Sequence, residues 1–361
     1  MDEKIKLIIN ALNNKVLFPY ELEIRPSAIC NLKCRICNPR QQFLEGKNYT
    51  KKNEQIELVT KDRYSSIFKE SVELGISNIN ICGGGEPFIR KDMIEIMKGI
   101  KEKGISGNIV TNGTLLNNEI IKELIEIKWD NIIFSVNGSN KLSDKFLRGD
   151  NAFIYSINNI KKILKMRQEK PKITLAPVVC KYNQNEIIDF IKLTKNLKID
   201  DLLFQPITLP KNLQKKYYII KTKEFKKYLK KCISISRSYS VKTNLNGLFS
   251  FYFNSLRKDY NKLPICFEPL YRMTIQPNGN AEPCPIVLKG PHNEIRSINI
   301  KYKSLKSIWN RNYFLKFRER LLNNIKPDKR FCEFCCGMIQ LNTIKIKDKL
   351  LKCNKRIQYN G

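Results

Sequence analysis

Apolar and polar positions follow two different periods along the first 206 residues. Short apolar or alternating runs, typical of strands, are separated by stretches of about ten or more residues with helical apolar spacing. The predicted strands are Glu21–Arg25, Ile76–Cys82, Gly107–Thr111, Asn131–Val136, Ile173–Val179 and Asp201–Gln205. The predicted helices are residues 2–14, Met93–Lys103, Asn117–Ile127, Ile154–Met166 and Glu186–Leu197.

This alternation predicts a parallel sheet, because strands joined through helices form right-handed β-α-β units. Counting the first strand gives six such units, too few for a closed eight-fold barrel. We therefore predict an α/β fold with a partial (β/α)6, TIM-like barrel and a small cysteine-rich C-terminal domain. The loops at the carboxyl ends of the strands would carry the chemistry.

The pattern changes after Pro206. Residues 211–260 are rich in lysine and tyrosine, with a helical stretch around Glu224–Ile235. A second module begins near Pro264 and holds half of the twelve cysteines. The predicted organisation is an N-terminal helix over 1–18, the partial barrel over 19–210, a basic linker region over 211–260 and the cysteine-rich domain over 261–361.

Composition limits the classes of function. The chain has 361 residues, 42% of them apolar, which is enough for a large core in one or two domains. It has no apolar run long enough for a membrane span and no apolar signal core, so a cytoplasmic protein is expected. The formal net charge is +32, and residues 211–231 carry nine lysines against one acid. This charge indicates either binding of a polyanion such as nucleic acid or simply solvated lysine faces.

Cysteine is the most informative residue type. Twelve cysteines without a secretion signal favour metal or redox chemistry over disulfides. His292 is the one histidine, which excludes a multi-histidine metal site. Cys82, Cys180 and Cys232 stand apart from the others and are expected to be small buried residues.

Two motifs follow consecutive predicted strands. Cys30, Cys34 and Cys37 come after the first strand, in the spacing Cys-x3-Cys-x2-Cys. Such a set could be part of a zinc site, or it could ligate three irons of a four-iron cluster and leave the fourth open. The sequence Gly-Gly-Gly-Glu-Pro at 83–87 follows the second strand. It is either a tight turn or a segment that brings backbone groups close to a ligand.

Together, in this order and context, the two motifs resemble those of the radical S-adenosylmethionine (SAM) enzymes over roughly residues 19–206. The resemblance implies a [4Fe-4S] cluster on Cys30, Cys34 and Cys37 whose open iron is chelated by SAM. It also implies reductive cleavage of SAM to a 5′-deoxyadenosyl radical that abstracts a substrate hydrogen, with a reductant such as flavodoxin or ferredoxin. One departure is Ile36, at a position that is usually aromatic in the family.

The same resemblance assigns SAM binding to residues in the glycine run and after the third and fourth strands. They are Gly84, Gly85, Glu86, Asn112, Ser135 and Arg148. The glycine run would meet the SAM amino group through its backbone, and Ser135 would lie near the ribose. Asn137 stands where related enzymes often have aspartate. Arg148 would pair with the SAM carboxylate through its planar fork, or it is a surface arginine.

The C-terminal cysteines form a second set that could close a zinc site or an iron–sulfur site. Their spacing resembles the auxiliary-cluster extension of radical SAM enzymes called SPASM or, in its shorter form, twitch. Two later cysteines of the full pattern would fall on Leu341 and Lys345, so the resemblance implies one auxiliary [4Fe-4S] cluster. Its expected ligands are Cys266, Cys284, Cys332 and Cys335, with Cys336 and Cys353 as alternatives.

Three functions remain open at this stage. The first is a radical SAM oxidoreductase or maturase whose saturated auxiliary cluster transfers electrons during oxidation of, or bond formation on, a sugar, small metabolite or peptide. About 20 residues precede the first strand, too few for a leader-peptide-binding domain, which favours a small substrate. The second is radical SAM modification of RNA, supported by the net charge. The third is a non-catalytic, zinc-bound interaction protein.

Overall fold

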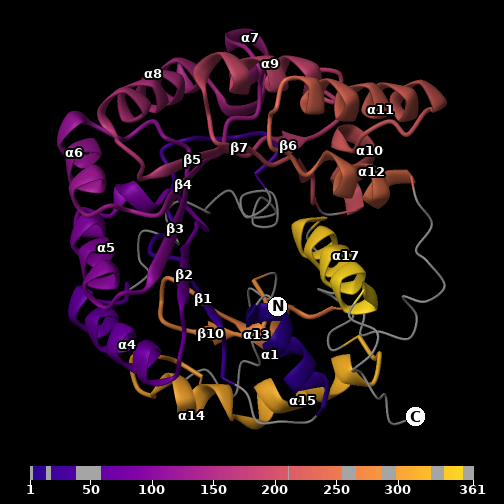
Figure 1. Cartoon of the computed structure of the whole chain (residues 1–361). Coiled ribbons are helices and arrows are strands. Elements are labelled where there is room, and N and C mark those ends of the chain that lie inside the picture. The colour runs from indigo at the N-terminus through magenta and orange to yellow at the C-terminus, as the bar shows by residue number, and fades with distance from the viewer. Residues whose placement is uncertain are drawn as a thin grey trace.

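The protein is built around a curved sheet with helices along its outer face (Figure 1). The structure is a computed structural model that describes residues 3–13, 18–37, 58–209, 211–253, 266–285, 298–326 and 337–352. Among these residues, eight strands form one sheet in the order β10-β9-β1-β2-β3-β4-β5-β7, and β6 pairs separately with β8.

The strands of the main sheet are short and nearly all parallel. In sheet order they are Ala281–Glu282 (β10), Arg272–Ile275 (β9), Glu21–Ile24 (β1), Asn78–Ile81 (β2), Ser106–Thr111 (β3), Asn131–Phe134 (β4), Lys172–Leu175 (β5) and Asp201–Leu202 (β7). Within this sheet β10 runs antiparallel to β9, and every other pair is parallel. The predicted α/β fold with a partial parallel barrel is therefore confirmed.

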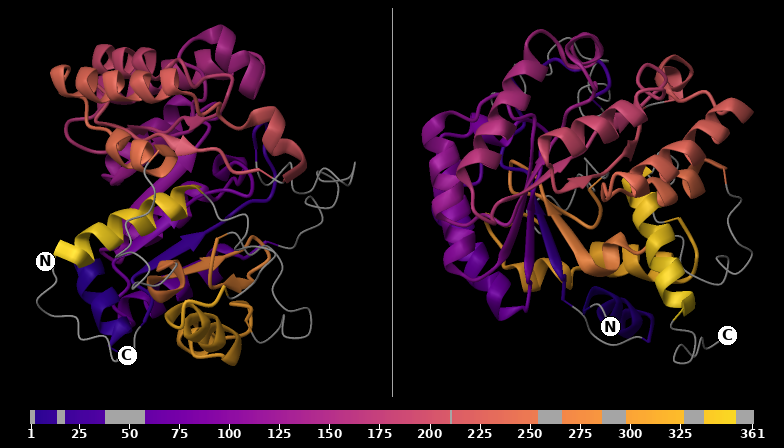
Figure 2. Two further views of the ribbon diagram at one scale, coloured as in Figure 1. Left: turned by 90° about the vertical axis from the view of Figure 1, so that its right-hand side faces the viewer. Right: turned by 45° about the horizontal axis from the view of Figure 1, so that its top comes forward.

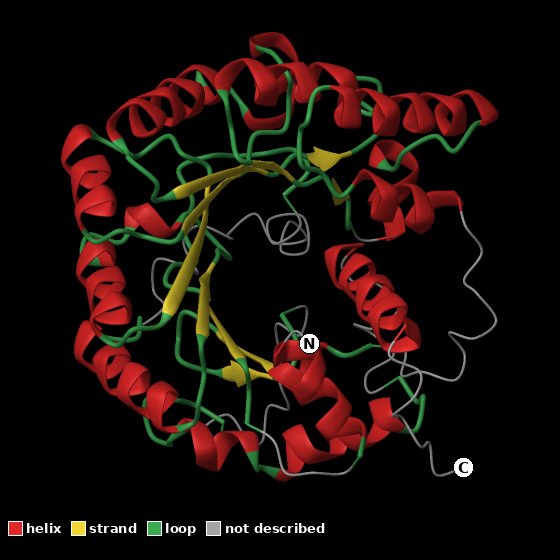
Figure 3. Cartoon of the chain, viewed as in Figure 1, coloured by secondary structure: helices red, strands yellow, loops and turns green. Residues whose placement is uncertain are grey.

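Five helices cover the outer face of the sheet (Figure 3). They are Lys61–Glu73 (α4), Met93–Glu102 (α5), Asn118–Glu126 (α6), Ala152–Met166 (α8) and Ile187–Leu197 (α9). The hydrophobic pattern predicted the last four and missed α4. The buried face of α4 holds just three large apolar side chains, Tyr64, Ile67 and Phe68, so its periodic signal is weak.

One predicted strand, Ile173–Val179, is divided into β5 and β6 (Val178–Val179). Pro177 lies at the break, where it has no N–H to donate to a ladder. Its carbonyl accepts a hydrogen bond from Gln205 N at 2.9 Å, at the start of β8 (Gln205–Pro206). β6 and β8 then pair in parallel as a second, two-stranded sheet.

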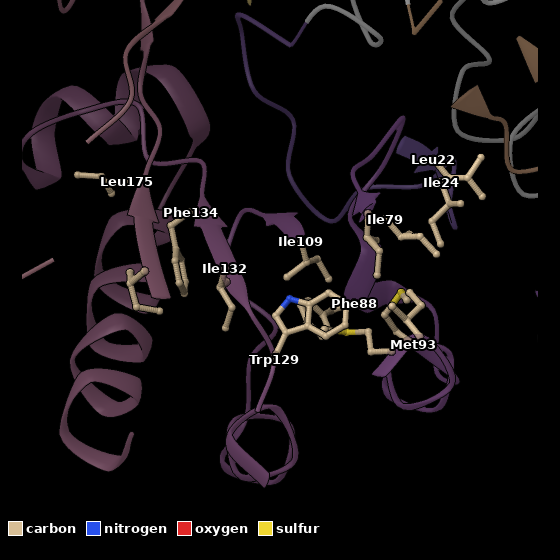
Figure 4. Close-up of a cluster of buried hydrophobic side chains, with 14 of the residues drawn as sticks. Leu22, Ile24, Ile79, Phe88, Met93, Ile109, Trp129, Ile132, Phe134 and Leu175 are labelled. Atoms are coloured by element: carbon tan, nitrogen blue, oxygen red, sulfur yellow. The ribbon is translucent and has the colours of Figure 1, made fainter. Parts of the chain in front are cut away.

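The main hydrophobic core lies between the sheet and the outer helices (Figure 4). Alternate strand residues supply fully buried side chains: Leu22, Ile24, Ile79, Ile109, Ile132, Phe134 and Leu175. Trp129, just before β4, packs against Gly107 of β3, where an added Cβ would lie 2.1 Å from the indole ring. Because burial of each large apolar side chain contributes about 1.5–3 kcal/mol, this layer stabilises the curved wall.

The opposite, inner face of the sheet is polar. Glu21 of β1 pairs with Arg272 of β9 at 2.8 Å and with Lys4 at 3.2 Å. Burial raises the pKa of Glu21, but Arg272 and Lys4 outweigh this effect and hold the pKa below its usual value. Asparagines on the neighbouring strands continue this hydrogen-bonded face: Asn78, Asn80 and Asn108.

The cysteine-rich C-terminal region shares the barrel's sheet. β9 pairs in parallel with all four residues of β1, opposite β2. Ile8, Tyr271 and Leu350 are packed together in a second core, which joins the N-terminal helix to C-terminal ones. The described helices of the N-terminal and C-terminal regions are Glu3–Leu12 (α1), Glu268–Tyr271 (α13), Leu305–Trp309 (α14), Asn312–Leu322 (α15) and Gly337–Lys352 (α17).

The region expected to be a basic linker is mainly helical over its described residues. It contains Lys211–Tyr217 (α10), Lys223–Ser238 (α11) and Leu245–Phe253 (α12). Phe225, Leu229 and Leu248 are buried in the main core, so this segment packs as part of the fold. α17 contacts both α12 and α1 and lies across the open side of the wall (Figure 2). No helix in the described ranges is long and apolar enough to cross a membrane.

Candidate active site

Cys30, Cys34 and Cys37 lie half-buried in one loop that follows β1. Burial, together with the charges of neighbouring thiolates, raises the pKa of Cys30 to about 11 and that of Cys34 to about 12. Binding to iron would stabilise the thiolate forms. Within the described ranges, no three His, Cys, Asp or Glu side chains are arranged to hold a metal ion. In a four-iron cluster each thiolate binds a different iron.

A short helix, α7 (Lys141–Arg148), supports the cysteine loop. Arg35 N donates to Leu147 O at 2.9 Å, and Cys34 Sγ lies 4.0 Å from the Arg148 carbonyl oxygen. Ile36 is 5% exposed and belongs to the same apolar cluster as Leu147. The residue that replaces the family's usual aromatic therefore packs the loop against α7.

The glycine run is paired with the segment that leads into the cysteine loop. Gly85 N donates to Ser27 O at 3.1 Å, and Glu86 N donates to Ile29 O at 2.7 Å. A Cβ at Gly85 would lie 1.9 Å from Ile29 O, so the close approach requires glycine there. A Cβ at Gly84 would meet nothing nearer than Ser27 O at 3.9 Å. This geometry fits a bound SAM, because there is space beside the Gly84 Cα, next to the segment that leads into the cysteine loop.

Glu86 links the glycine run to the turn after β3. Its carboxylate accepts hydrogen bonds from Thr111 Oγ1 at 2.6 Å, from Asn112 N at 2.8 Å and from Phe88 N at 3.3 Å. The side chain is buried, and burial raises its pKa to about 6 although these hydrogen bonds act in the opposite direction. Glu86 is thus a structural support of the loop.

The structure places Asn112 against the cysteine loop. Its Nδ2 donates to Asn31 Oδ1 at 2.9 Å and lies 3.9 Å from Cys30 Sγ. Its Oδ1 accepts from Thr114 N at 2.8 Å. The amide therefore fixes the position of one cysteine from the end of the third strand.

Arg148 is buried, with 2% of its surface exposed. Its Nε donates to Asp144 Oδ1 at 2.8 Å, and its Nη1 donates to the carbonyls of Asn112 at 3.1 Å and Ser135 at 2.7 Å. Nη2 donates to Ser156 Oγ at 3.1 Å. The guanidinium therefore binds chain groups at the ends of β3 and β4, and it is not a surface arginine.

Two of these partners were missed in the sequence analysis, Asp144 and Ser156. Asp144 is fully buried and accepts from the backbone N–H groups of Asn137 at 2.9 Å and Gly138 at 3.0 Å. Its signal in the sequence was the spacing of four residues from Arg148 on a helix. Ser156 Oγ donates to the carbonyl oxygen of Asn112, which also accepts from Arg148 Nη1. No sequence motif indicates that these residues meet.

Two of the four expected auxiliary ligands lie in described segments. Cys266 precedes α13, Cys284 follows β10, and both pack against Phe317 and Leu321 of α15. The structure therefore places two cysteines that are 18 positions apart in the sequence against the same helix. The other two expected ligands, Cys332 and Cys335, and the alternatives Cys336 and Cys353 lie outside the described residues.

The isolated cysteines differ from one another. Cys180 and Cys232 are buried in apolar clusters, as expected of small core residues. Cys82, directly after β2, instead interacts with Glu23 of β1 and with Arg25, which follows β1, and burial raises its pKa. Arg25 Nη2 also donates to Pro285 O at 2.6 Å, next to Cys284. Arg25, which no motif marked, thus connects β1 to the auxiliary cysteine segment.

Two family models match the chain. That of the radical SAM superfamily matches residues 24–194, and that of the SPASM iron–sulfur cluster-binding domain matches residues 266–336. A probable GTP 3′,8-cyclase of Saccharolobus islandicus is 29% identical over 226 residues, 62% of this chain and 68% of the relative. The tungsten-containing aldehyde ferredoxin oxidoreductase cofactor-modifying protein of Pyrococcus furiosus is 24% identical over 344 residues, 87% of this chain and 88% of the relative.

Solved structures share the fold. SuiB of Streptococcus suis bound to the precursor peptide SuiA has a TM-score of 0.65 and 19% identity, covering 94% of this chain and 74% of SuiB. The anSMEcpe protein with bound AdoMet, which is SAM, has a TM-score of 0.62 and 19% identity, covering 93% of this chain and 98% of anSMEcpe. By the two family models, the chain carries a radical SAM domain over residues 24–194 and a C-terminal SPASM iron–sulfur cluster-binding domain over residues 266–336.

Proposed function

We propose that this protein cleaves SAM reductively and abstracts a hydrogen atom from its substrate, with an auxiliary [4Fe-4S] cluster assisting electron transfer. The observation that supports this most is the pairing of the cysteine loop with the glycine run, through Glu86 N and Ile29 O at 2.7 Å. When bound, a reduced cluster and SAM together supply a 5′-deoxyadenosyl radical. The proposed cluster ligands are Cys30, Cys34 and Cys37.

In this proposal the other residues of the site position the ligands. Gly84, where an added Cβ would meet no atom nearer than Ser27 O at 3.9 Å, would lie against the amino end of SAM. Glu86 fixes the turn that carries Asn112, and Asn112 in turn holds the Cys30 side of the loop. Ser135 remains our candidate for a ribose contact, and Arg148 binds the Ser135 carbonyl.

The auxiliary site determines the reaction class that we favour. Four cysteine ligands would saturate a second cluster and leave no open iron, so this cluster would pass electrons and not hold substrate. An electron acceptor near a substrate radical favours net oxidation or bond formation. The proposed ligands are Cys266, Cys284, Cys332 and Cys335.

The substrate class that we favour is a peptide, with a sugar or another small metabolite as the alternative. The peptide is supported by the SuiB complex with its precursor peptide, whose fold matches 94% of this chain. The probable GTP cyclases and the cofactor-modifying protein among the relatives support a small substrate. Modification of RNA is supported by the net charge of +32 and would require binding that weakens steeply with salt.

Metal analysis tests the proposal first. After anaerobic purification we expect iron and acid-labile sulfide, and zinc without sulfide would contradict enzyme function. Cys30→Ala should lose the iron of one cluster and all 5′-deoxyadenosine formation. The matched control is Cys232→Ala, because Cys232 is buried in the apolar core and should retain both.

The substrate can then be sought directly. The cluster-loaded enzyme is incubated with fractionated cell extract, reductant and SAM. A fraction that stimulates 5′-deoxyadenosine release is analysed by mass spectrometry for a loss of two hydrogens or a new cross-link. Stimulation by a protease-sensitive fraction would support a peptide, and stimulation by a nuclease-sensitive fraction would favour RNA.

A further inference from the structure

An aromatic and basic surface adjoins the cysteine loop. Six residues from four separate segments form it: Arg35, Phe146, Lys181, Tyr182, Lys216 and Tyr217. Arg35 belongs to the cysteine loop and Phe146 to α7. Lys181 and Tyr182 follow β6, and Lys216 and Tyr217 belong to α10. We call this set the aromatic–cation patch. No sequence motif could indicate it, because the residues converge through the fold.

The three rings of the patch contact one another in a row. Phe146 and Tyr182 have ring centroids 4.8 Å apart, and Tyr182 and Tyr217 have centroids 5.9 Å apart. Each ring carries a cation: Arg35 is 4.8 Å from the Phe146 centroid, and Lys181 and Lys216 are each 5.4 Å from their tyrosine rings. Such contacts hold flexible basic side chains over the aromatic surface.

The outer part of the patch is exposed and positively charged, whereas Tyr217 at its inner end is buried with 4% of its surface exposed. Phe146 is 41% exposed and Tyr182 is 38% exposed, although large aromatic side chains are usually more buried. The nearby carboxylates are engaged elsewhere: Asp144 is buried against Arg148, and Glu186 accepts from Ser143 Oγ at 2.9 Å. Apolar rings with a basic rim are typical of a protein-binding surface.

Its position relative to the cluster ligands suggests a function. Arg35 lies between Cys34 and Cys37 in the sequence, and its backbone N–H is bound to Leu147, next to Phe146. A protein that docks on the patch would therefore contact the loop that holds the cluster. Electron transfer between proteins requires such proximity, because its rate falls steeply with distance.

We propose that the aromatic–cation patch docks a small acidic protein that carries one electron. The proposal rests on the proposed function, which requires that the cluster gain one electron for each SAM cleaved, while the carrier loses one. Opposite charge favours such a partner for a chain with a net charge of +32. Interfaces of electron carriers are small and weak, so a patch of six residues is adequate.

Nucleic acid fits the patch less well. Successive bases stack on open, parallel aromatic faces. Here the rings are inclined by 50° and 64° to each other, and a cation lies over each of them. The geometry therefore favours a protein surface with acidic side chains.

The test uses charge reversal away from the cluster loop. In Lys181→Glu/Lys216→Glu, two patch cations become acids. The matched control is Lys69→Glu/Lys122→Glu, which changes the net charge equally at exposed positions on α4 and α6. We measure the dissociation constant of an acidic flavodoxin or ferredoxin for the cluster-loaded protein, and the rate at which that carrier bleaches the cluster absorbance. Dithionite, which needs no docking site, serves as the reference reductant.

We expect the patch variant to bind the carrier about tenfold or more weakly at low ionic strength, with slower reduction by the carrier and unchanged reduction by dithionite. Its carrier binding should also depend less on salt. Phe146→Ala should weaken carrier binding and retain the salt dependence, because it removes apolar contact and no charge. The control variant should behave as wild type.

Carrier binding and reduction at wild-type rates in both patch variants would overturn the proposal. Loss of RNA binding in the charge-reversal variant, with carrier binding unchanged, would also overturn it and assign the patch to nucleic acid. Wild-type protein that is reduced by dithionite but does not cleave SAM would contradict the proposed function. The carrier-binding measurement would still decide the docking proposal.

Discussion

Arg148 and Asp144 form a buried ion pair one turn apart on α7, with Arg148 Nε 2.8 Å from Asp144 Oδ1 and 2.9 Å from Oδ2. The carboxylate also accepts from two backbone N–H groups after β4. The guanidinium donates to the carbonyls of Asn112 and Ser135, which follow β3 and β4. The pair thus connects the segments that we expect to surround SAM.

We predict that Asp144→Asn destabilises the protein by about 3–5 kcal/mol, because it leaves a buried guanidinium without its counter-charge. Arg148→Lys should also lower stability, since an ammonium cannot reproduce the planar set of donors. Both variants should weaken SAM binding through movement of the strand ends. Thermal unfolding and equilibrium binding of SAM measure the two effects.

The comparison of these effects also tests the direct role expected of Arg148. A residue that touches the SAM carboxylate would lose SAM affinity on change to lysine with little loss of stability. A residue that positions the loops would lose both together. Unchanged unfolding temperature in Arg148→Lys would contradict the positioning role.

The glycine run offers a pair of adjacent substitutions with opposite expected results. Gly85→Ala should prevent the normal pairing of the two loops, because its Cβ would lie 1.9 Å from Ile29 O, and the protein should bind less iron. Gly84→Ala should retain iron, because its Cβ would be 3.9 Å from Ser27 O, but it should weaken SAM binding. Iron content and SAM titration separate the two outcomes. Equal iron loss in both variants would argue against the assigned roles.

Glu86 should make stability depend on pH. Burial raises its pKa to about 6 from an ordinary value of 4.5, so the folded state binds the proton more tightly than the unfolded state. The contribution of Glu86 to the free energy of unfolding is fully present below the pKa of the unfolded state. It is lost as the pH rises through the pKa of the folded state, and the total loss is about 2 kcal/mol. The free energy of unfolding of Glu86→Gln, measured with denaturant across this pH range, should lack this pH dependence. A wild-type profile in the variant would refute it.

The two cysteine sets should differ in their effect on SAM cleavage. Cys30→Ala removes a proposed ligand of the SAM-binding cluster and should abolish 5′-deoxyadenosine formation. Cys332→Ala affects the proposed auxiliary cluster and should leave some SAM cleavage that is uncoupled from product. Liquid chromatography of 5′-deoxyadenosine and of the modified substrate measures SAM cleavage and product formation separately. Complete loss in both variants would indicate that the second cluster supports the structure or controls the first.

The sequence predicted the outline of the site because its loops follow strands with clear hydrophobic patterns. β1 to β4 and the helices α5 and α6, which connect β2 to β3 and β3 to β4, were anticipated, and with them the nearness of the cysteine loop to the glycine run. The division of one strand at Pro177 could be explained by its missing N–H but was not predicted. The helix α4 was missed because its apolar face is narrow.

Contacts between distant segments could not be predicted. Asp144, Ser156 and Arg25 act through partners that converge only in the folded chain. The pairing of β9 with β1 was hidden for the same reason, because about 250 residues separate the two strands and no local pattern encodes such a contact. Hydrophobic periodicity specifies which face of a strand is buried, and it does not identify the neighbouring strand.

The position of β9 limits how this protein can be divided. β1 lies between β2 and β9, so a chain that stopped before β9 would leave a row of β1 backbone groups unpaired. It would also leave Glu21 without Arg272. Such a fragment would be prone to aggregation, and a grafted C-terminal region from another enzyme would need a matching β1. The barrel wall and the C-terminal region are therefore a single folding unit, in which a change to β1 or β9 constrains the other strand.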